Sequence, residues 1–313
     1  MSDNQITVIG AANIDIHGFS FEEMIPKESN PGRVKFCLGG VGRNISENLA
    51  RVGMDVSLIS AIGGDANSKW LLSSCREIGI DMSGTIVFEH MNSSIYLDLM
   101  NSSGDMELGL SDLVVLEMMT PEHLMARHDR INSAKIIVMD TGVSEAVLYH
   151  ILDHYAHIPI FIDPVSSPKA RKIKNRLGGI HTLKLNKLEA SFLTDIKITD
   201  QDSLSAAAAE VIRQGVKRVF ITLGEEGVYY REGSYGNCFK AAAQKVVNAT
   251  GAGDAFMAGT IYAFIRGYDL DTTAKVASGF ALITLADEHT VSPKITKEAV
   301  AEIVGNQKEA KQC

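Results

Sequence analysis

The sequence contains only four cysteines, and no two of them are spaced as a known cysteine motif. Cys37, Cys75, Cys238 and Cys313 are scattered along 313 residues, and no pair has CxxC spacing. Disulfide frameworks and zinc motifs place cysteines at short, repeated spacings, so this distribution argues against both. The thiols are therefore expected to be reduced, as in a reducing compartment.

Long apolar runs and basic blocks are also missing. No stretch approaches the roughly 20 apolar residues that a membrane-spanning helix needs, and the N-terminus lacks the basic start and cleavage site of a secretory signal. Acidic residues (38) outnumber basic residues (30), which gives a formal net charge of −8. Nucleic acids and anionic membranes attract basic surfaces. Neither is an expected partner, and a cytoplasmic location is predicted.

Two common nucleotide-binding motifs are absent. The chain has no GxxxxGK[ST], and Gly10 stands alone after the first apolar run, where a GxGxxG would be expected. If the protein binds a nucleotide, it must use a different cradle. Hydrophobic residues make up 45% of the chain and charged residues 22%, a balance typical of a globular protein with a large core.

Short apolar runs alternate with amphipathic helical stretches along most of the chain. The strand candidates are residues 6–9, 56–59, 136–139, 160–162, 182–185 and 219–221, and the helix candidates are 45–52, 65–77, 145–155 and 204–214. Several of the runs are almost purely apolar, as in parallel strands buried on both faces. We therefore predict an α/β fold with a doubly wound, mostly parallel sheet and helices on both faces, as a single domain over residues 1–313.

One region departs from this rhythm. Residues 94–99 and 106–110 alternate polar and apolar side chains around a turn at residues 101–104, which predicts a half-exposed antiparallel hairpin. Together with residues 32–38, this hairpin is interpreted as a small β lid made by insertions around residues 12–38 and 84–111. An ordinary edge hairpin would show the same pattern.

The strongest chemical signal is the segment 248–256, with Gly251-Ala252-Gly253-Asp254 at its centre. It is predicted to follow a strand at residues 245–247 and to open a helix over residues 254–265. Glycines allow close backbone approach to a ligand, and a helix start offers free N–H groups to an anion. Asp254 is then either a helix cap or the acceptor of a proton from a substrate hydroxyl.

A second glycine cluster, Gly39-Gly40-Val41-Gly42-Arg43-Asn44, also precedes a helix. A tight strand-to-helix turn needs small residues, but three glycines in four positions favour a ligand contact as well. Asn13 and Asp15, at the end of the first strand, have the carboxylate and amide that suit a vicinal diol. A turn or cap is the alternative for this pair.

Two further segments follow apolar strands. Asn186 and Glu189 share one face of an opening helix turn, where they suit a hydrated Mg²⁺ or form a helix cap. The segment from Thr222 to Gly227 lies at a sheet edge where open α/β folds bind ligands, and it also suits a hairpin turn.

Taken in order, these segments resemble the ribokinase (PfkB) family of carbohydrate kinases. The resemblance extends from Ile6 to about Lys297, with residues 39–44 similar to the N-terminal signature and residues 248–254 similar to the C-terminal one. It implies a doubly wound domain with a β lid that often forms a dimer contact, so a homodimer through the lid is expected.

The resemblance also implies a role for each matching position. Asp254 would accept the substrate proton, beside an anion hole made by the N–H groups of Gly251, Ala252 and Gly253. ATP would be the co-substrate. The remaining assignments are Asn13, Asp15, Gly39, Gly40 and Asn44 for the sugar, Asn186, Thr222, Gly224 and Gly227 for ATP, and Glu189 for Mg²⁺, held through water.

Within the family, the likeness is to the bacterial kinases that act on pseudouridine, on residues 12–15, 29–32, 39–44 and 181–186. One departure concerns Asn248, where many relatives carry an Asp that helps to bind K⁺. The amide lacks that charge, which puts K⁺ activation in question. A kinase of ribose, adenosine or another nucleoside and a catalytically silent sensor of sugar or nucleotide are the alternatives.

Overall fold

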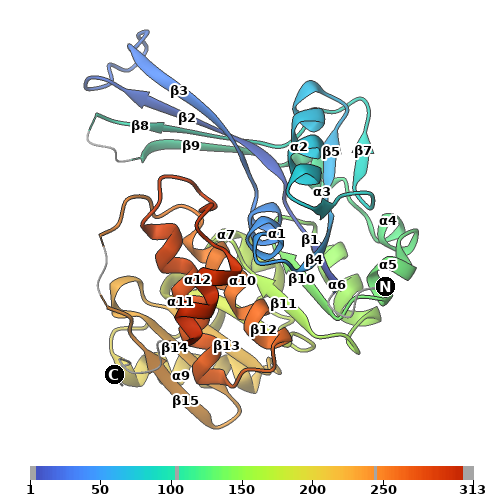
Figure 1. Cartoon of the computed structure of the whole chain (residues 1–313), viewed down its shortest axis with the longest axis vertical. Helices are drawn as coiled ribbons and strands as arrows, with labels where there is room; N and C mark the ends of the chain where they lie inside the picture. Colours follow the sequence, from blue (N-terminus) through green and yellow to red (C-terminus); the bar gives the residue numbers. More distant parts are fainter. Residues whose placement is uncertain (1–4, 103–105, 243–244, 306–313) are drawn as a thin grey trace.

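The computed structural model describes residues 5–102, 106–242 and 245–305. A nine-stranded sheet runs through the molecule in the order β15-β14-β13-β12-β11-β10-β1-β4-β6 (Figure 1). The bounds are β1 Gln5–Ile9, β4 Asp55–Ile59, β6 Ile80–Asp81, β10 Ile136–Asp140, β11 Ile160–Asp163, β12 Thr182–Asn186, β13 Arg218–Thr222, β14 Val228–Glu232 and β15 Tyr235–Phe239. Neighbours from β6 to β13 are parallel, whereas β14 and β15 are antiparallel.

Helices cover both faces of this sheet, as the apolar runs predicted. Successive residues of β10 point to opposite faces, so Ile137 and Met139 join one buried core and Ile136 and Val138 join the other. The first core is covered by α6 Glu145–His154, α8 Lys187–Thr194 and α9 Gln201–Arg213. The second is covered by α1 Val41–Arg51, α2 Ala66–Glu77, α10 Ala252–Ile265, α11 Leu270–Leu285 and α12 Lys297–Gly305.

Shorter elements complete the body. These are the strand pair β5 Ala61–Gly63 and β7 Ile86–Phe88, the helices α3 Val114–Glu117, α4 Pro121–Met125, α5 His128–Asn132 and α7 Ser167–Ala170, and the 3₁₀ turns Arg171–Ile173 and Gly224–Glu226. Asp65 caps α2 by accepting a hydrogen bond from the Ser68 N–H, a role for which Asp is a preferred residue.

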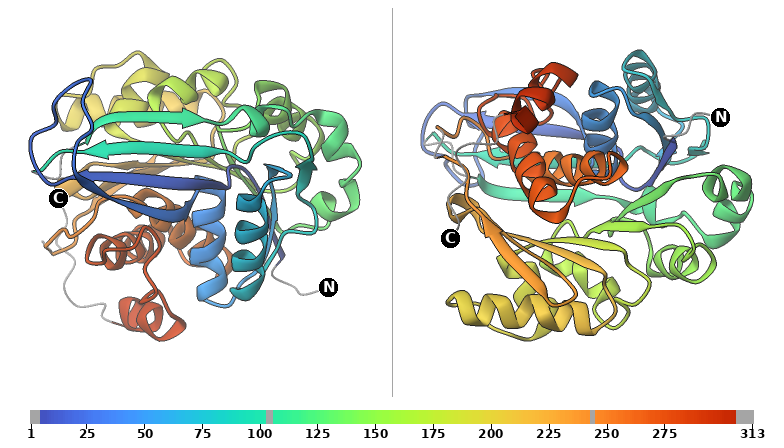
Figure 2. Two further views of the ribbon diagram at one scale, coloured as in Figure 1. Left: turned by 90° about the horizontal axis from the view of Figure 1, so that it is seen from above. Right: turned by 60° about the horizontal axis from the view of Figure 1, so that its bottom comes forward.

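A separate four-stranded sheet, called here the small sheet, projects from one end of the body, and Figure 2 shows it from above. Its order is β3-β2-β8-β9, with bounds β3 Gly32–Gly39, β2 Asn13–Ser20, β8 Ile95–Met100 and β9 Met106–Asp112. The predicted antiparallel hairpin of β8 and β9 is confirmed. Residues 103–105, which include part of the predicted turn, lie outside the described residues.

One predicted strand is wrong. Residues 245–247 are not a strand, and Val246 and Val247 are each at least half exposed. The N–H groups of Val247 and Asn248 instead donate to the Leu285 carbonyl at the end of α11. Two adjacent valines resemble the start of a buried strand in sequence, but here the segment is held by the end of α11 instead of by a neighbouring strand.

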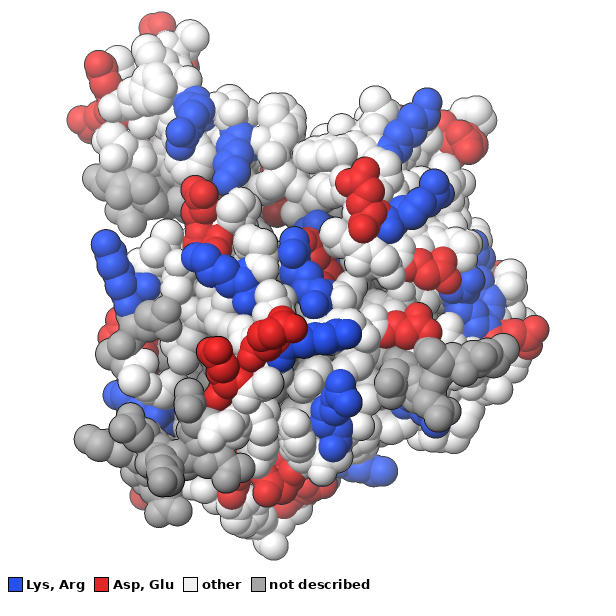
Figure 3. Space-filling model, in the orientation of Figure 1, with Lys and Arg blue, Asp and Glu red and all other residues white. Residues whose placement is uncertain are grey.

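Charged side chains of both signs lie on the surface of the molecule (Figure 3). On the face shown in Figure 3, Lys and Arg are interspersed with Asp and Glu, without an extended area of one sign. No helix among the described residues has the length and apolar character that crossing a bilayer requires.

Candidate active site

Asn13 and Asp15 were predicted at the end of the first strand, but β1 ends at Ile9 and the pair lies at the start of β2, where the small sheet leaves the body. Asn13 pairs with Gly39 across the β2–β3 ladder, and its side-chain amide donates to the Asp15 carboxylate. A side chain at position 39 would collide with that carboxylate, so the glycine makes room for it. Burial raises the pKa of Asp15 to about 6, against the opposing effect of His17.

The glycine cluster connects this strand to α1. Gly40 has a φ of 96°, and a Cβ there would lie 2.5 Å from the Ala11 carbonyl oxygen, so only glycine fits. Asn44, in the first turn of α1, donates from Nδ2 to Oδ2 of Asp254 over 2.9 Å. The first and last signatures, 210 residues apart in sequence, are therefore in direct contact.

Asp254 lies in the first turn of α10, which packs against α1. Gly251 precedes that helix with a φ of 82°, and a Cβ there would collide with the Thr290 carbonyl. Asp254 is 9% exposed. Burial raises its pKa to about 7, nearby Asp163 adds to the rise, and the Asn44 hydrogen bond and Lys184 oppose it.

Lys184 is a member of the site that the sequence analysis missed. Its ammonium is buried 3.0 Å from the Asp163 carboxylate, and a Cβ at Gly253 would lie 2.7 Å from Nζ. Burial alone would lower the pKa of Lys184, but the carboxylates of Asp163, Glu189 and Asp254 raise it above its ordinary value. A lysine inside the apolar strand 182–185 was the available signal, because buried strands seldom hold an unpaired cation.

Asp140 was also missed, and it holds the first glycine cluster in place. Its carboxylate accepts hydrogen bonds from the backbone N–H groups of Ala11 (2.7 Å), Gly42 (2.9 Å) and Gly142 (2.8 Å). Asp140 and Asp163 are the last residues of two apolar strands, at the carboxyl ends where open α/β folds place their ligand sites. That shared position in the sequence was the signal for a functional role of both carboxylates.

Asn186 and Glu189 form a complete capping box at the start of α8. Asn186 Oδ1 accepts from the Glu189 N–H, and Glu189 Oε2 accepts from the Asn186 N–H, each at 2.8 Å. The cap, which the sequence left as an alternative, is therefore present. Glu189 is nonetheless buried, which raises its pKa against the effect of Lys184.

Thr222 lies opposite Asn186 at the shared edge of β12 and β13. The segment that follows it is the hairpin turn into β14. Gly227 has a φ of 98° and its Cβ would collide with the Phe239 carbonyl, whereas a Cβ at Gly224 would meet nothing within 4 Å. The hairpin requires Gly227, and Gly224 has space for a ligand.

The predicted residues thus form two groups. The first group lies around Asp254 and the start of α10, and its other members are Asn13, Asp15, Gly39, Gly40 and Asn44. The second group lies at the carboxyl ends of β12 and β13, and its members are Asn186, Glu189, Thr222 and Gly224. Lys184 connects the groups, since its ammonium interacts electrostatically with both Glu189 and Asp254. A proton acceptor beside a helix N-terminus, with carboxylates and an ammonium nearby, suits phosphoryl transfer.

Comparison with known proteins shows the family of this chain. The protein-family model described as "pfkB family carbohydrate kinase" matches residues 3–297. The chain belongs to this family. The kinase is 37% identical over 302 residues to pseudouridine kinase of Escherichia coli, with 96% of each chain covered.

Solved structures show the same fold. A carbohydrate kinase from Agrobacterium tumefaciens superposes with a TM-score of 0.85 at 25% identity, over 99% of this chain and 100% of that one. Ribokinase from Thermotoga maritima superposes with a TM-score of 0.83 at 20% identity, over 96% and 99%. The protein is therefore a ribokinase-like, ATP-dependent kinase of a sugar or nucleoside hydroxyl, and kinases of this kind use ATP with a divalent metal ion.

Proposed function

We propose that this kinase transfers the γ-phosphoryl group of ATP to the 5′-hydroxyl of pseudouridine, giving pseudouridine 5′-phosphate and ADP. The substrate rests on the similarity to the E. coli pseudouridine kinase over 96% of both chains. The observation that carries the mechanism is the contact between Asn44 and Asp254, which brings the glycine cluster next to a buried carboxyl group.

In the proposed reaction, Asp254 accepts the proton of the substrate hydroxyl. The hydroxyl oxygen forms a bond to the γ-phosphorus, and the bond from that phosphorus to the bridging oxygen of ADP breaks. The transition state of phosphoryl transfer is loose, so positioning and charge stabilisation matter more than base strength. A carboxyl group with a pKa of about 7 is deprotonated in a large fraction of the molecules at neutral pH, which suits a general base.

The negative charge of the transferring group would be stabilised at the start of α10. The first N–H groups of a helix have no intrahelical acceptor and lie at its positive end. The N–H groups of Gly251, Ala252 and Gly253 are assigned to this anion hole. Lys184, next to Gly253, adds a positive charge on the same side. Asn13, Asp15, Gly39, Gly40 and Asn44 would hold the sugar hydroxyls.

Asn186, Thr222, Gly224 and Gly227 are assigned to ATP. The donor set also fits Mg²⁺, which binds through one or two carboxylates, waters and phosphate oxygens. Glu189 uses Oε2 for the cap, and we assign its carboxylate to a hydrated Mg²⁺. When bound with ATP, Mg²⁺ neutralises charge on the phosphates.

Asn248 replaces the carboxylate with which many relatives bind K⁺. Its Nδ2 donates to the Glu288 carbonyl and its Oδ1 accepts from the Thr250 N–H. Both polar atoms of this neutral amide are thus engaged. We expect K⁺ to change the rate only slightly.

We also propose that the small sheet is a lid over the sugar and the contact surface of a homodimer. One of its faces carries Phe36 and Val34 on β3 and Leu108 and Leu110 on β9, each 59–67% exposed. Exposed apolar patches on a folded chain mark contact surfaces, and a second copy would cover this one.

The test is ADP release by the purified protein with ATP and Mg²⁺ against pseudouridine, uridine, adenosine, cytidine and ribose, with and without K⁺. Turnover that is at least tenfold faster on pseudouridine than on the others is the expected result. Faster turnover on ribose or adenosine would agree with the proposed mechanism and contradict pseudouridine as the substrate. Absence of ADP release on all five, with ATP binding retained, would favour a sensor.

A further inference from the structure

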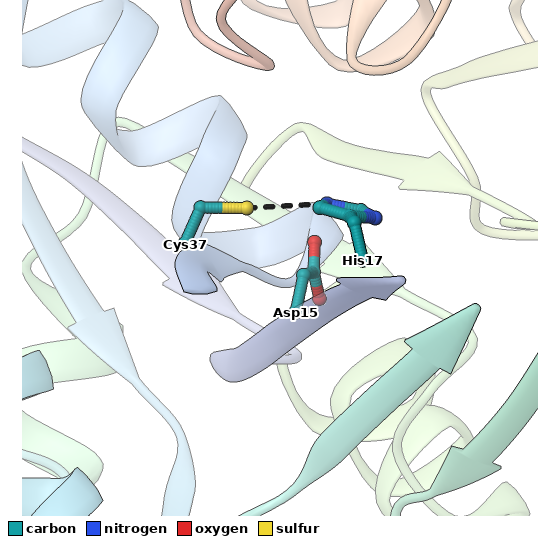
Figure 4. A group of neighbouring side chains, drawn as sticks. All are labelled: Asp15, His17 and Cys37. Atoms are coloured by element: carbon teal, nitrogen blue, oxygen red, sulfur yellow. Dashed lines mark hydrogen bonds between the residues drawn. The ribbon is translucent and has the colours of Figure 1, made fainter. Parts of the chain in front are cut away.

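Three potential metal ligands lie together on the small sheet, and the proposed mechanism uses only one of them. Asp15 and His17 are two residues apart on β2, so their side chains point to the same face. Cys37 is the cross-strand partner of Asp15 on β3. One ligand atom from each of the three side chains lies within 4.8 Å of the other two. Figure 4 shows the three side chains converging on one side of β2.

The distances suit a small, tetrahedral ion. His17 Nε2 lies 3.2 Å from Cys37 Sγ. Zinc bonds of about 2.0–2.1 Å to nitrogen and about 2.3 Å to sulfur separate such ligand atoms by about 3.5 Å. Small rotations of side chains would bring all three to that spacing. Because the ligands stand on two hydrogen-bonded strands, the backbone already holds them in place.

The other ring nitrogen of His17 has the partner that metal-binding histidines usually have. Nδ1 lies 2.9 Å from both carboxylate oxygens of Asp98, on the neighbouring strand β8. A carboxylate at Nδ1 fixes the ring and directs Nε2 towards the ion. Asp98 is 7% exposed, so water competes little for this contact.

We propose that His17, Cys37 and Asp15 form a binding site for Zn²⁺, with Asp98 orienting His17. A thiolate and an imidazole select Zn²⁺ over Mg²⁺, which prefers oxygen ligands alone. The cysteine spacing argued against a zinc motif, because the cysteine and the histidine of this site are 20 residues apart and meet only through strand pairing.

The site has a consequence for activity, and this consequence rests on the proposed function. Asp15 is assigned to the sugar hydroxyls, and a carboxylate bound to Zn²⁺ is not free to accept their hydrogen bonds. Zn²⁺ and the nucleoside therefore compete for Asp15. Zn²⁺ is an inhibitor that raises the KM for the nucleoside and leaves the KM for ATP unchanged.

The site itself is tested without kinase activity, by titrating the metal-free protein with Co²⁺ and recording its absorption spectrum. The wild type is expected to show a thiolate-to-cobalt charge-transfer band and the visible bands of tetrahedral Co²⁺. Cys37→Ser should lose the charge-transfer band, and Asp98→Asn should weaken binding about 10–100-fold. Cys238→Ser, a buried cysteine on β15, is the matched control and should keep the full spectrum.

A wild-type spectrum without the charge-transfer band, or the same band in Cys37→Ser, would overturn the site. Circular dichroism of each variant shows whether it is folded, and His17→Gln serves as a second variant if Cys37→Ser is not. Neither result depends on the kinase substrate, so the proposed function would stand.

The competition is tested by kinetics at saturating ATP and Mg²⁺, with free Zn²⁺ fixed by a metal buffer because ATP also binds zinc. Inhibition competitive with the nucleoside, and at least tenfold weaker in Cys37→Ser, is expected. A nucleoside that fails to displace Co²⁺ from a site with the thiolate band would overturn the competition and the assignment of Asp15 to the sugar. The metal site would remain.

Discussion

Asp254 has a charge that its surroundings disfavour. It is buried beside Asp163, and without the Asn44 amide and the Lys184 ammonium its pKa would rise further than about 7. A carboxyl group that ionises near neutrality takes up a proton readily in this range. Activity is therefore expected to follow its ionisation, with kcat/KM rising as the pH increases through about 7.

Replacing Asp254 with Asn should leave the fold intact, because the amide oxygen still accepts the hydrogen bond from Asn44. It removes the proton acceptor, so kcat should fall about 10²–10⁴-fold, and the rise of kcat/KM near pH 7 should disappear. Steady-state kinetics across pH 5–9 measure both effects. Asp269→Asn, a change at the exposed cap of α11, is the control. Unchanged turnover in Asp254→Asn would contradict the assignment of the base.

The Lys184 ammonium opposes the rise that burial causes in the pKa of Asp254 and of Glu189. Lys184→Met removes the ammonium, so the pKa of Asp254 should rise and the pH at which kcat/KM increases should shift upward. The same change leaves Asp163 buried without its partner, which should cost about 3–5 kcal/mol of folding free energy. The pH profile separates the two roles: a loss of stability with an unshifted profile would make Lys184 purely structural.

At the scale of secondary-structure elements, the start of α10 depends on a backbone conformation that suits glycine. Gly251→Ala places a side chain at a φ of 82° and against the Thr290 carbonyl. Gly267, at the end of the same helix, has a φ of 71° but open space around its Cβ position. Gly267→Ala should therefore cost only the strain of the left-handed conformation, about 1–2 kcal/mol.

Gly251→Ala should cost more than this control and should also lower kcat, because the collision displaces the N–H groups assigned to the phosphoryl group. Urea unfolding gives the free energies of both variants, and kinetics gives kcat. Equal destabilisation of the two variants, with wild-type kcat in both, would contradict the assignment of the start of α10 to the phosphoryl group.

The same elements show what sequence can and cannot predict. Residues 136–139 and 160–162 are nearly pure apolar runs because parallel strands are buried on both faces, so the sheet could be predicted. Residues 245–247 carry a similar signal, yet Val246 and Val247 are each at least half exposed and the segment hydrogen-bonds to the end of α11. A local pattern favours burial, whereas the partner that a segment finds depends on the whole topology.

The close packing at the glycine clusters could be predicted, because a run of glycines stands out in sequence. The glycines at 39–42 and 251–253 lie where an added side chain would collide with neighbouring atoms, and the ligand contact is our proposal for them. The pair of Lys184 and Asp163 and the cluster of His17 with Cys37 are each made by neighbouring strands that are distant in sequence. Such contacts are set by sheet order and register, which the local pattern does not contain.

At the scale of the whole molecule, the small sheet has faces of opposite character. The face with Asp15, His17 and Asp98 is polar and largely buried, whereas the opposite face exposes Phe36 and Leu110. Removing the apolar face of this sheet from water would be favourable. Covering this face with the same face of a second copy would give a symmetric contact and would fix the small sheet above the site.

Replacing Phe36 and Leu110 together with Glu should therefore convert a dimer into a monomer in sedimentation velocity. Each buried large apolar side chain contributes about 1.5–3 kcal/mol, and in a symmetric dimer both copies lose it, so dissociation should be complete at micromolar concentration. Met125→Glu, at an exposed position of α4, should remain dimeric. Because the small sheet carries Asp15, the monomer should show a raised KM for the nucleoside with an unchanged KM for ATP. A variant that stays dimeric would place the interface elsewhere, and a wild type that sediments as a monomer would leave the apolar face to a different partner.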